Sequence, residues 1–202
     1  MKKLLYILCL APLCAHAAVD YRLVGKAEDY LNGITGLTGE FSQLSNGKKD
    51  GGAFSMLRPG RIRLDYKTRP IQLISNGKSL YFYDRSLDQI TTLPLTSTPA
   101  GILVRKRIDL ANADIEVSET LSTVDGFAVK MHIRNQEGAG NMSIFFSANP
   151  VALRSWTVID ATGAKTEVAF KDLRTKTDFS KNYFELQKMK TATNSAEDAY
   201  YR

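Results

Sequence analysis

Residues 52–95 constrain the fold more than any other part of this chain, because short apolar runs alternate there with strong turn signals. Ile62, Leu64 and Tyr66 alternate with charged residues, which is the period of a strand that buries one face. The Asn-Gly pair at 76–77 separates two further runs, and we expect a tight hairpin in which both residues take positive φ. The stretch predicts an antiparallel meander whose apolar face must be covered by another layer.

A helix is predicted at residues 21–32, before the meander. Asp20 suits its N-cap position, and Leu23, Ala27 and Leu31 recur on one helical stripe with charged residues elsewhere. This stripe should pack against the apolar face of the sheet.

A second, shorter helix is predicted after the meander. Thr98 is a suitable N-cap with a proline directly after it, and Ile102 and Leu103 supply apolar side chains. A basic group follows at 105–107 and should lie at the end of this helix, with a further turn reaching Leu110.

Strand periodicity resumes after this helix and is clearest in the alternation that contains Val129, Met131 and Ile133. Further strands are predicted at residues 37–44, 53–57, 115–117, 142–146, 153–159, 165–173 and 179–186. No internal repeat or domain boundary interrupts the pattern. We therefore expect one mainly β domain with helices (α+β), in which about eleven antiparallel strands curve around the helices on their concave face.

Residues 1–17 have the pattern of a cleaved secretory signal peptide: two lysines, an apolar run and an Ala-x-Ala cleavage site. Neither Cys9 nor Cys14 follows the small residue expected before a lipidated cysteine, so we expect a released, soluble protein. The mature domain would span residues 18–189, followed by a polar tail at 190–202. Cleavage leaves 25 basic residues (27 − 2) against 21 acidic ones, a mildly basic net charge of +4.

The residues that enzymes and metal sites require are scarce in this chain. His132 is the only histidine after cleavage, and its register places it on the polar face of a strand. Asp84 and Asp88 are the best carboxylate pair, but they fall in a predicted turn, where aspartate is common. We expect no enzyme activity, no metal site, no cofactor and, without a basic run, no nucleic-acid binding.

Two segments of the meander, RPGRIRLDY and LISNGKSLYFYDRSLDQI, resemble the periplasmic outer-membrane lipoprotein carrier family, LolA. The shared elements are an Arg-Pro pair, a Ser-Asn-Gly-Lys turn, an aromatic strand ending in Tyr-Asp and a glutamine before the next strand. The resemblance implies an unclosed antiparallel β-barrel with a helical lid. Typical members differ by a tryptophan at the position of Leu64 and by a Pro-Gly segment after the last aromatic strand.

The resemblance also implies roles for individual residues. Arg58, from the Arg-Pro pair, is the expected lid latch, an arginine that binds free carbonyls at a helix end. The lid helices are expected to contribute Leu23, Ala27, Leu31, Ile102 and Leu103. The acyl-chain cavity is expected to be lined by Ile62, Leu64, Tyr66, Leu73, Leu80, Phe82, Met131, Ile144 and Phe146. From the residues alone, an ordinary dry core is the favoured explanation of this apolar face, and the resemblance reverses that preference.

The function implied is a monomeric carrier that binds the acyl chains of lipoproteins in an apolar cavity. It would load from an inner-membrane ABC transporter of the LolCDE kind and unload to an outer-membrane receptor lipoprotein of the LolB kind. The alternative is a periplasmic binding protein of the same fold that binds another lipid or senses envelope stress. An exported hydrolase is disfavoured by the missing nucleophile and base.

Overall fold

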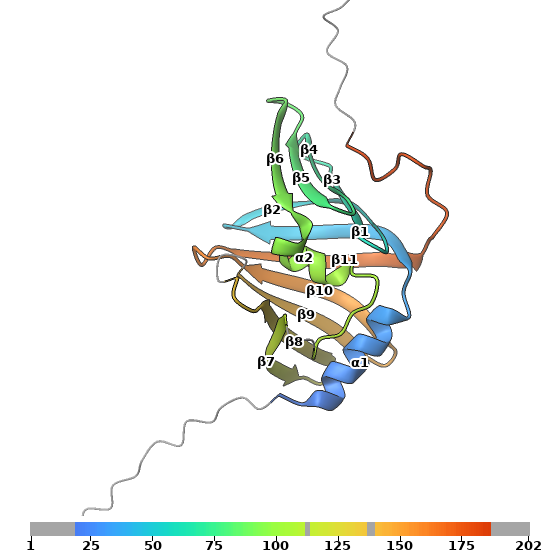
Figure 1. Ribbon diagram of the computed structural model, residues 1–202, viewed down its shortest axis with the longest axis vertical. Helices are drawn as coiled ribbons and strands as arrows, with labels where there is room; N and C mark the ends of the chain where they lie inside the picture. Colours follow the sequence, from blue (N-terminus) through green and yellow to red (C-terminus); the bar gives the residue numbers. More distant parts are fainter. Residues whose placement is uncertain (1–18, 112–113, 137–139, 187–202) are drawn as a thin grey trace, which may run out of the picture.

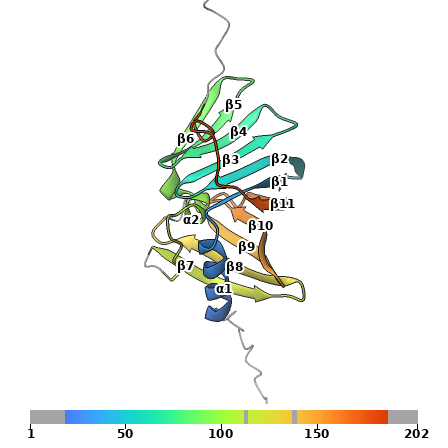
Figure 2. The same cartoon turned by 90° about the vertical axis from the view of Figure 1, so that its right-hand side faces the viewer.

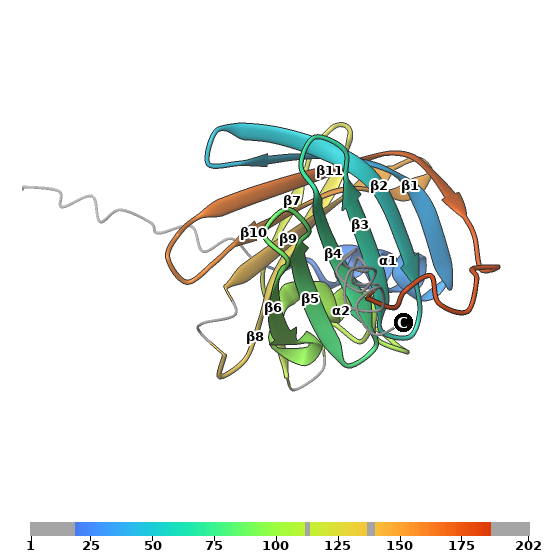
Figure 3. The ribbon, with the colours of Figure 1, turned by 90° about the horizontal axis from the view of Figure 1, so that it is seen from above.

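The computed structural model describes residues 19–111, 114–136 and 140–186 (Figure 1). Eleven strands form one antiparallel sheet in the order β6-β5-β4-β3-β2-β1-β11-β10-β9-β8-β7. β6 and β7 stand at the two ends of this order, so the sheet curls in the described part of the chain without closing (Figure 3). This confirms the predicted unclosed antiparallel barrel. The strands are β1 (Gly36–Ser45), β2 (Lys48–Leu57), β3 (Arg61–Tyr66), β4 (Ile71–Asn76), β5 (Ser79–Asp84), β6 (Gln89–Pro94), β7 (Ile115–Ser122), β8 (Gly126–Ile133), β9 (Asn141–Ala148), β10 (Val151–Ile159) and β11 (Lys165–Thr175).

Two α-helices, α1 (Tyr21–Asn32) and α2 (Pro99–Leu103), lie inside the curve of the sheet (Figures 1 and 2). Both begin at the predicted caps. The Asp20 side chain accepts a hydrogen bond from the amide of Arg22, and the Thr98 side chain accepts one from the amide of Gly101. A 3₁₀ turn, η1 (Leu95–Ser97), leads into α2. The sequence signals therefore place both helix starts correctly.

The strand register assigns side chains to the two faces of the sheet. Leu64 pairs with Phe54 and Leu73, and Leu73 pairs with Phe82, so all of these lie on one face. On the other half of the sheet, Ile144 pairs with Val129 and Trp156, which continue the same face. This concave face and the helices form one buried apolar core.

The outer face of β2 and β3 is crossed by the segment at residues 176–186. Arg63 donates a hydrogen bond from Nη1 to the carbonyl of Tyr183 at 2.6 Å, and the hydroxyls of Ser55 and Tyr183 are 3.0 Å apart. The prediction of a strand at 179–186 was wrong, because these residues form turns. Phe179, Tyr183 and Phe184 pack against one another, with every pair of ring centroids 5.0 Å apart, instead of alternating between two faces.

Two turns and one helix end differ from the predictions. The loop between β1 and β2 is only the pair Asn46-Gly47, both with positive φ, so β2 begins earlier than expected. At the predicted hairpin only Gly77 has positive φ (106°), because Asn76 ends β4 and its side chain accepts from the amides that follow. α2 ends at Leu103 and does not extend to Leu110.

The predicted signal peptide at 1–17 and the tail at 190–202 lie outside the described residues. Among those that are described, every helix is too short or too polar to span a bilayer.

Candidate functional site

α1 covers the half of the concave face formed by β8 to β10. Val24, Ala27 and Leu31 recur at helical spacing and are buried. Tyr30 meets Phe146 edge to face, with ring centroids 5.8 Å apart. The helix is held by apolar packing, which is strong in sum but has no fixed direction.

α2 covers the middle of the concave face (Figure 1). Ile102 and Leu103 are 1% and 2% exposed, so the predicted apolar side chains point into the core. A Cβ atom at Gly101 would lie 2.2 Å from the carbonyl oxygen of Leu95, so only glycine lets the helix fold back on η1.

The loop between β2 and β3 binds the C-terminal end of α2. Arg58 donates a hydrogen bond from Nε to the carbonyl of Leu103 at 3.0 Å, and Gly60 donates one from its amide to the carbonyl of Val104 at 2.6 Å. The amide of Arg58 donates to the carbonyl of Thr35, three residues after the end of α1. The carbonyls of the last helical turn have no partners within the helix, so this loop supplies their hydrogen-bond donors.

The guanidinium of Arg58 is unusual because it is buried and only partly satisfied. The residue is 8% exposed, and its Nη2 atom is buried without a hydrogen-bond partner. Burial lowers the pKa of Arg58 to about 10, so the group is still charged at neutral pH. Burying this charge costs free energy, which the charge-assisted hydrogen bond to Leu103 helps to offset.

Residues 104–111, which we call the strap, follow α2 in the chain and pack against α1. Asn32 donates to the carbonyl of Ile108 at 2.8 Å and accepts from its amide at 2.9 Å. Glu28 accepts a hydrogen bond from the amide of Leu110 at 2.5 Å. Ile108 and Leu110 are buried, so apolar contacts anchor the same segment. These contacts take the backbone out of the helical path and explain why α2 stops before Leu110.

The basic group at 105–107 follows α2, as predicted, but its three members differ. Arg105 forms a bidentate ion pair with Asp114, at 2.6 Å and 3.1 Å, whereas Lys106 and Arg107 are exposed. The hydrogen bonds from Arg105 hold the pKa of Asp114 below its usual value. Arg105 thus fixes the start of the strap, and its two neighbours are free for contacts with other molecules.

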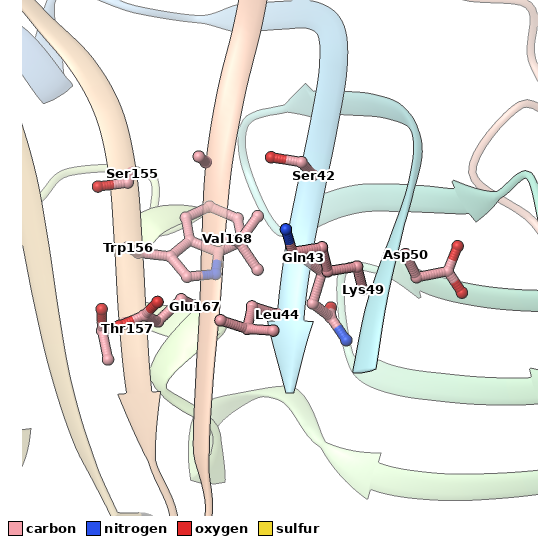
Figure 4. A pocket seen from close by; sticks show the side chains of 11 residues that line it. Ser42, Gln43, Leu44, Lys49, Asp50, Ser155, Trp156, Thr157, Glu167 and Val168 are labelled. Carbon is pink, nitrogen blue, oxygen red and sulfur yellow. The ribbon is translucent and has the colours of Figure 1, made fainter. Parts of the chain in front are cut away.

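A pocket of 530 Å³ spans β2, β1, β11 and β10 (Figure 4). Hydroxyl, amide and charged groups make up much of its lining, and Leu44, Trp156 and Val168 are its larger apolar members. None of the predicted cavity residues lines it. Where the sequence predicted a cavity, side chains of α1 and α2 share one buried core with the concave face.

Local contacts account for each of the candidate catalytic residues. His132 is on the polar face of β8, with Nε2 3.8 Å from a carboxylate oxygen of Glu116. Asp84 and Asp88 are in the predicted turn, where Asp84 accepts from the amide of Ser86 and Asp88 from the hydroxyl of Tyr83. The described residues contain no group of three or more histidine, cysteine, aspartate or glutamate side chains that could hold a metal ion.

A lidded, apolar, unclosed sheet is the architecture that the sequence resemblance implied, and comparison with known families agrees. The family model described as "Outer membrane lipoprotein carrier protein LolA" matches residues 32–187. The chain belongs to the LolA family. Its match begins at the end of α1 and includes the whole sheet.

Several curated relatives of this LolA-family chain carry the name outer-membrane lipoprotein carrier protein. The one from Methylococcus capsulatus is 29% identical over 185 residues, covering 84% of this chain and 86% of the relative. The one from Azotobacter vinelandii is 30% identical over 166 residues, covering 76% and 78%. A solved LolA superfamily structure from Nitrosomonas europaea has a TM-score of 0.42 and 13% identity, covering 84% of this chain and 99% of that one.

All nine predicted cavity residues of this LolA-family chain lie on the concave face, but their exposure differs. Tyr66 and Leu73 are partly buried, and Phe82 is 41% exposed. Phe82 shares the face of Leu73 but lies on β5, next to the edge strand β6, beyond the cover of the helices. The fully enclosed members are Ile62, Leu64, Leu80, Met131, Ile144 and Phe146.

Of the predicted lid residues, Ala27, Leu31, Ile102 and Leu103 are buried and Leu23 is partly buried. Sequence reasoning missed Val24, which is 3% exposed and lies three residues before Ala27, a spacing that could have revealed it. It also missed Asn32, Glu28 and the strap, for which the sequence has no local signal.

Proposed function

We propose that this LolA-family protein is a periplasmic carrier that binds the acyl chains of lipoproteins in its concave face. The observation that carries the proposal is an apolar face closed by short helices that a few polar contacts hold in place. A core that only stabilises the fold would not need a buried, half-satisfied arginine at the lid. The names of the curated relatives support the same role.

The energetics of acyl burial suit this arrangement. Each buried methylene contributes about 0.8 kcal/mol, so several acyl chains contribute roughly tens of kcal/mol in total. The hydrogen bond between Arg58 and Leu103 contributes about 1.5–3 kcal/mol. Cargo can therefore displace α1 and α2, whose apolar side chains fill the empty cavity, without nucleotide hydrolysis in the carrier itself.

The proposed route has two partners. An inner-membrane ABC transporter of the LolCDE kind would supply the lipoprotein, and an outer-membrane receptor lipoprotein of the LolB kind would accept it. We propose that the carrier acts as a monomer and as a binding protein, not as an enzyme. Closing the lid after release would restore the buried contacts of α2 with the β2–β3 loop.

The test is recovery of the bound species. The tagged protein would be isolated from periplasm, and its ligands identified by mass spectrometry, with an Arg58→Leu variant in parallel to trap cargo. Acylated outer-membrane lipoproteins as the main species would support the proposal. Recovery of free lipids alone would overturn it and favour a lipid-binding or envelope-sensing role.

A further inference from the structure

The sheet is split between two strands that are neighbours in its order. β10 and β11 pair only from Ser155 with Ala169 to Ile159 with Lys165. Beyond Ser155, β10 pairs only with β9, and beyond Ala169, β11 pairs only with β1. The two strands therefore separate toward the end of the sheet near α1.

A β-bulge lies on each side of the split. In β10 the register passes from Leu153 directly to Ser155, so Arg154 is the extra residue. In β11 the register shifts between its pairs with Thr38 and Glu40, and Asp172 there takes a positive φ of 53°. Bulges redirect side chains, and these two place charged residues at the rim of the split.

A pocket of 420 Å³ occupies the split. Its volume is within the range of small-molecule sites. Phe170 and Leu173 are partly buried and supply its accessible apolar surface, whereas Leu37 and Leu153 are each only 4% exposed. Tyr30 and Ile34 approach the pocket from the end of α1. These residues belong to the core or pack against it, so the pocket is the place where the core meets solvent between two strands.

The rim of this pocket carries Arg154, Arg174 and Asp172. Both arginines are exposed, and neither forms an ion pair within the described residues. Asp172 is 3.9 Å from Lys171, which partly balances its charge. The rim is thus positive beside an apolar floor.

We propose that the split between β10 and β11 binds a lipid with a phosphate headgroup. The acyl chain would lie on Phe170 and Leu173, and the phosphate would contact Arg154 and Arg174. Guanidinium groups match phosphate because each offers paired donors in a fixed plane. This site is separate from the concave cavity and does not require that lipoproteins be the cargo.

The chain contains a reporter for this site. Trp156 is its only tryptophan, and the indole packs on the ring of Phe170 with centroids 4.6 Å apart. Its fluorescence would be followed in titrations of the whole protein with decyl phosphate, decyl maltoside and inorganic phosphate. We expect saturable binding of decyl phosphate with an affinity about tenfold or more higher than that of the other two compounds. Only decyl phosphate has both an alkyl chain for the apolar floor and a phosphate for the arginines of the rim.

A charge series at the rim tests the location. Arg154→Gln and Arg174→Gln should each weaken decyl phosphate binding about tenfold, as expected for the loss of one charge-assisted contact. Asp172→Asn should strengthen binding, and asparagine tolerates the same positive φ. Lys48→Gln is the matched control, because Lys48 is exposed at the opposite end of the sheet, beside the β1–β2 turn.

The arginine variants should weaken binding and the aspartate variant should strengthen it. This difference in direction separates binding at the rim from a structural effect of substitution. Equal binding of decyl phosphate and decyl maltoside would overturn the inference, as would a decyl phosphate affinity that the three rim variants leave unchanged. A protein that shows the charge series but recovers no lipoprotein from periplasm would contradict the carrier role and leave this site intact.

Discussion

Arg58 and Leu103 are 45 positions apart in the sequence, yet one hydrogen bond of 3.0 Å joins the guanidinium of one to the carbonyl of the other. This bond connects the β2–β3 loop to the end of α2, and the neighbouring Nη2 is buried without a partner. In the proposed carrier, the closed position of α2 would therefore depend on a group that is only partly satisfied.

Arg58→Leu should leave the fold intact and still accept cargo, yet slow the transfer of lipoprotein to the acceptor membrane. The substitution removes the hydrogen bond to Leu103, worth about 1.5–3 kcal/mol, from the closed state alone. The equilibrium between the closed and the cargo-loaded states would then shift toward the loaded state by roughly ten- to 150-fold. Transfer of labelled lipoprotein to receptor vesicles measures this. Arg58→Lys should restore transfer only in part, because lysine lacks the planar fork. Wild-type transfer by Arg58→Leu would refute the latch.

Asn32→Ala should loosen the strap, because Asn32 satisfies both the amide and the carbonyl of Ile108. We expect a loss of about 1–3 kcal/mol in the free energy of unfolding and increased binding of a bis-anilinonaphthalene dye. Asp29→Ala on the same helix is the control, since the Asp29 side chain forms no hydrogen bond with the strap in the described part of the chain. Equal stability of the two variants in urea would show that the strap contributes nothing.

The wild-type protein should bind the same dye stoichiometrically while fully folded, and Phe82→Glu should reduce this binding with little loss of stability. Phe82 is 41% exposed, so a carboxylate there stays hydrated but disrupts the apolar surface. Leu64→Glu should instead destabilise the fold by several kcal/mol, because Leu64 is 2% exposed. Dye titration and thermal unfolding separate the two effects. Normal dye binding by Phe82→Glu would remove this residue from the site.

Lys106→Gln with Arg107→Gln should reduce loading from membranes and leave stability within about 0.5 kcal/mol, since both side chains are exposed. Arg105→Gln should lower stability slightly, because it breaks the pair with Asp114. Loading would be followed as release of lipoprotein from spheroplasts. If a variant that carries all three substitutions loads at the wild-type rate, the basic group serves only the helix end and the strap.

Lowering the pH should remove the contribution of Asp114 to the free energy of unfolding. Its pKa is lowered in the folded state, so its carboxylate adds stability that is present above the ordinary value of 3.8 and is lost as pH falls through the folded value. The free energy of unfolding of the wild type should therefore exceed that of Asp114→Asn slightly at pH 7, and the difference should disappear as pH falls through the lowered pKa of Asp114. Asp125→Asn, at an exposed position, is the control. A difference that persists at low pH would contradict the assignment.

The sequence by itself determined the local structure. The caps at Asp20 and Thr98, the meander and the inward-facing side chains of β3 and β8 follow from groups within a few residues of each other. A strand places alternate side chains on opposite faces whatever covers it, so the face of Phe82 was predictable. Its exposure was not, because that depends on how far the lid extends.

Only the tertiary structure decided which distant groups meet. Asn32 and Ile108 are 76 positions apart, and their reciprocal hydrogen bonds depend on where the curved sheet places α1 and the strap. The split between β10 and β11 arises from two bulges whose consequences appear only when the strands pair with their other neighbours. Local periodicity specifies which side of a strand faces the core. The cover of the sheet by the helices, the bond between Arg58 and Leu103 and the split between β10 and β11 depend instead on contacts between segments far apart in the chain.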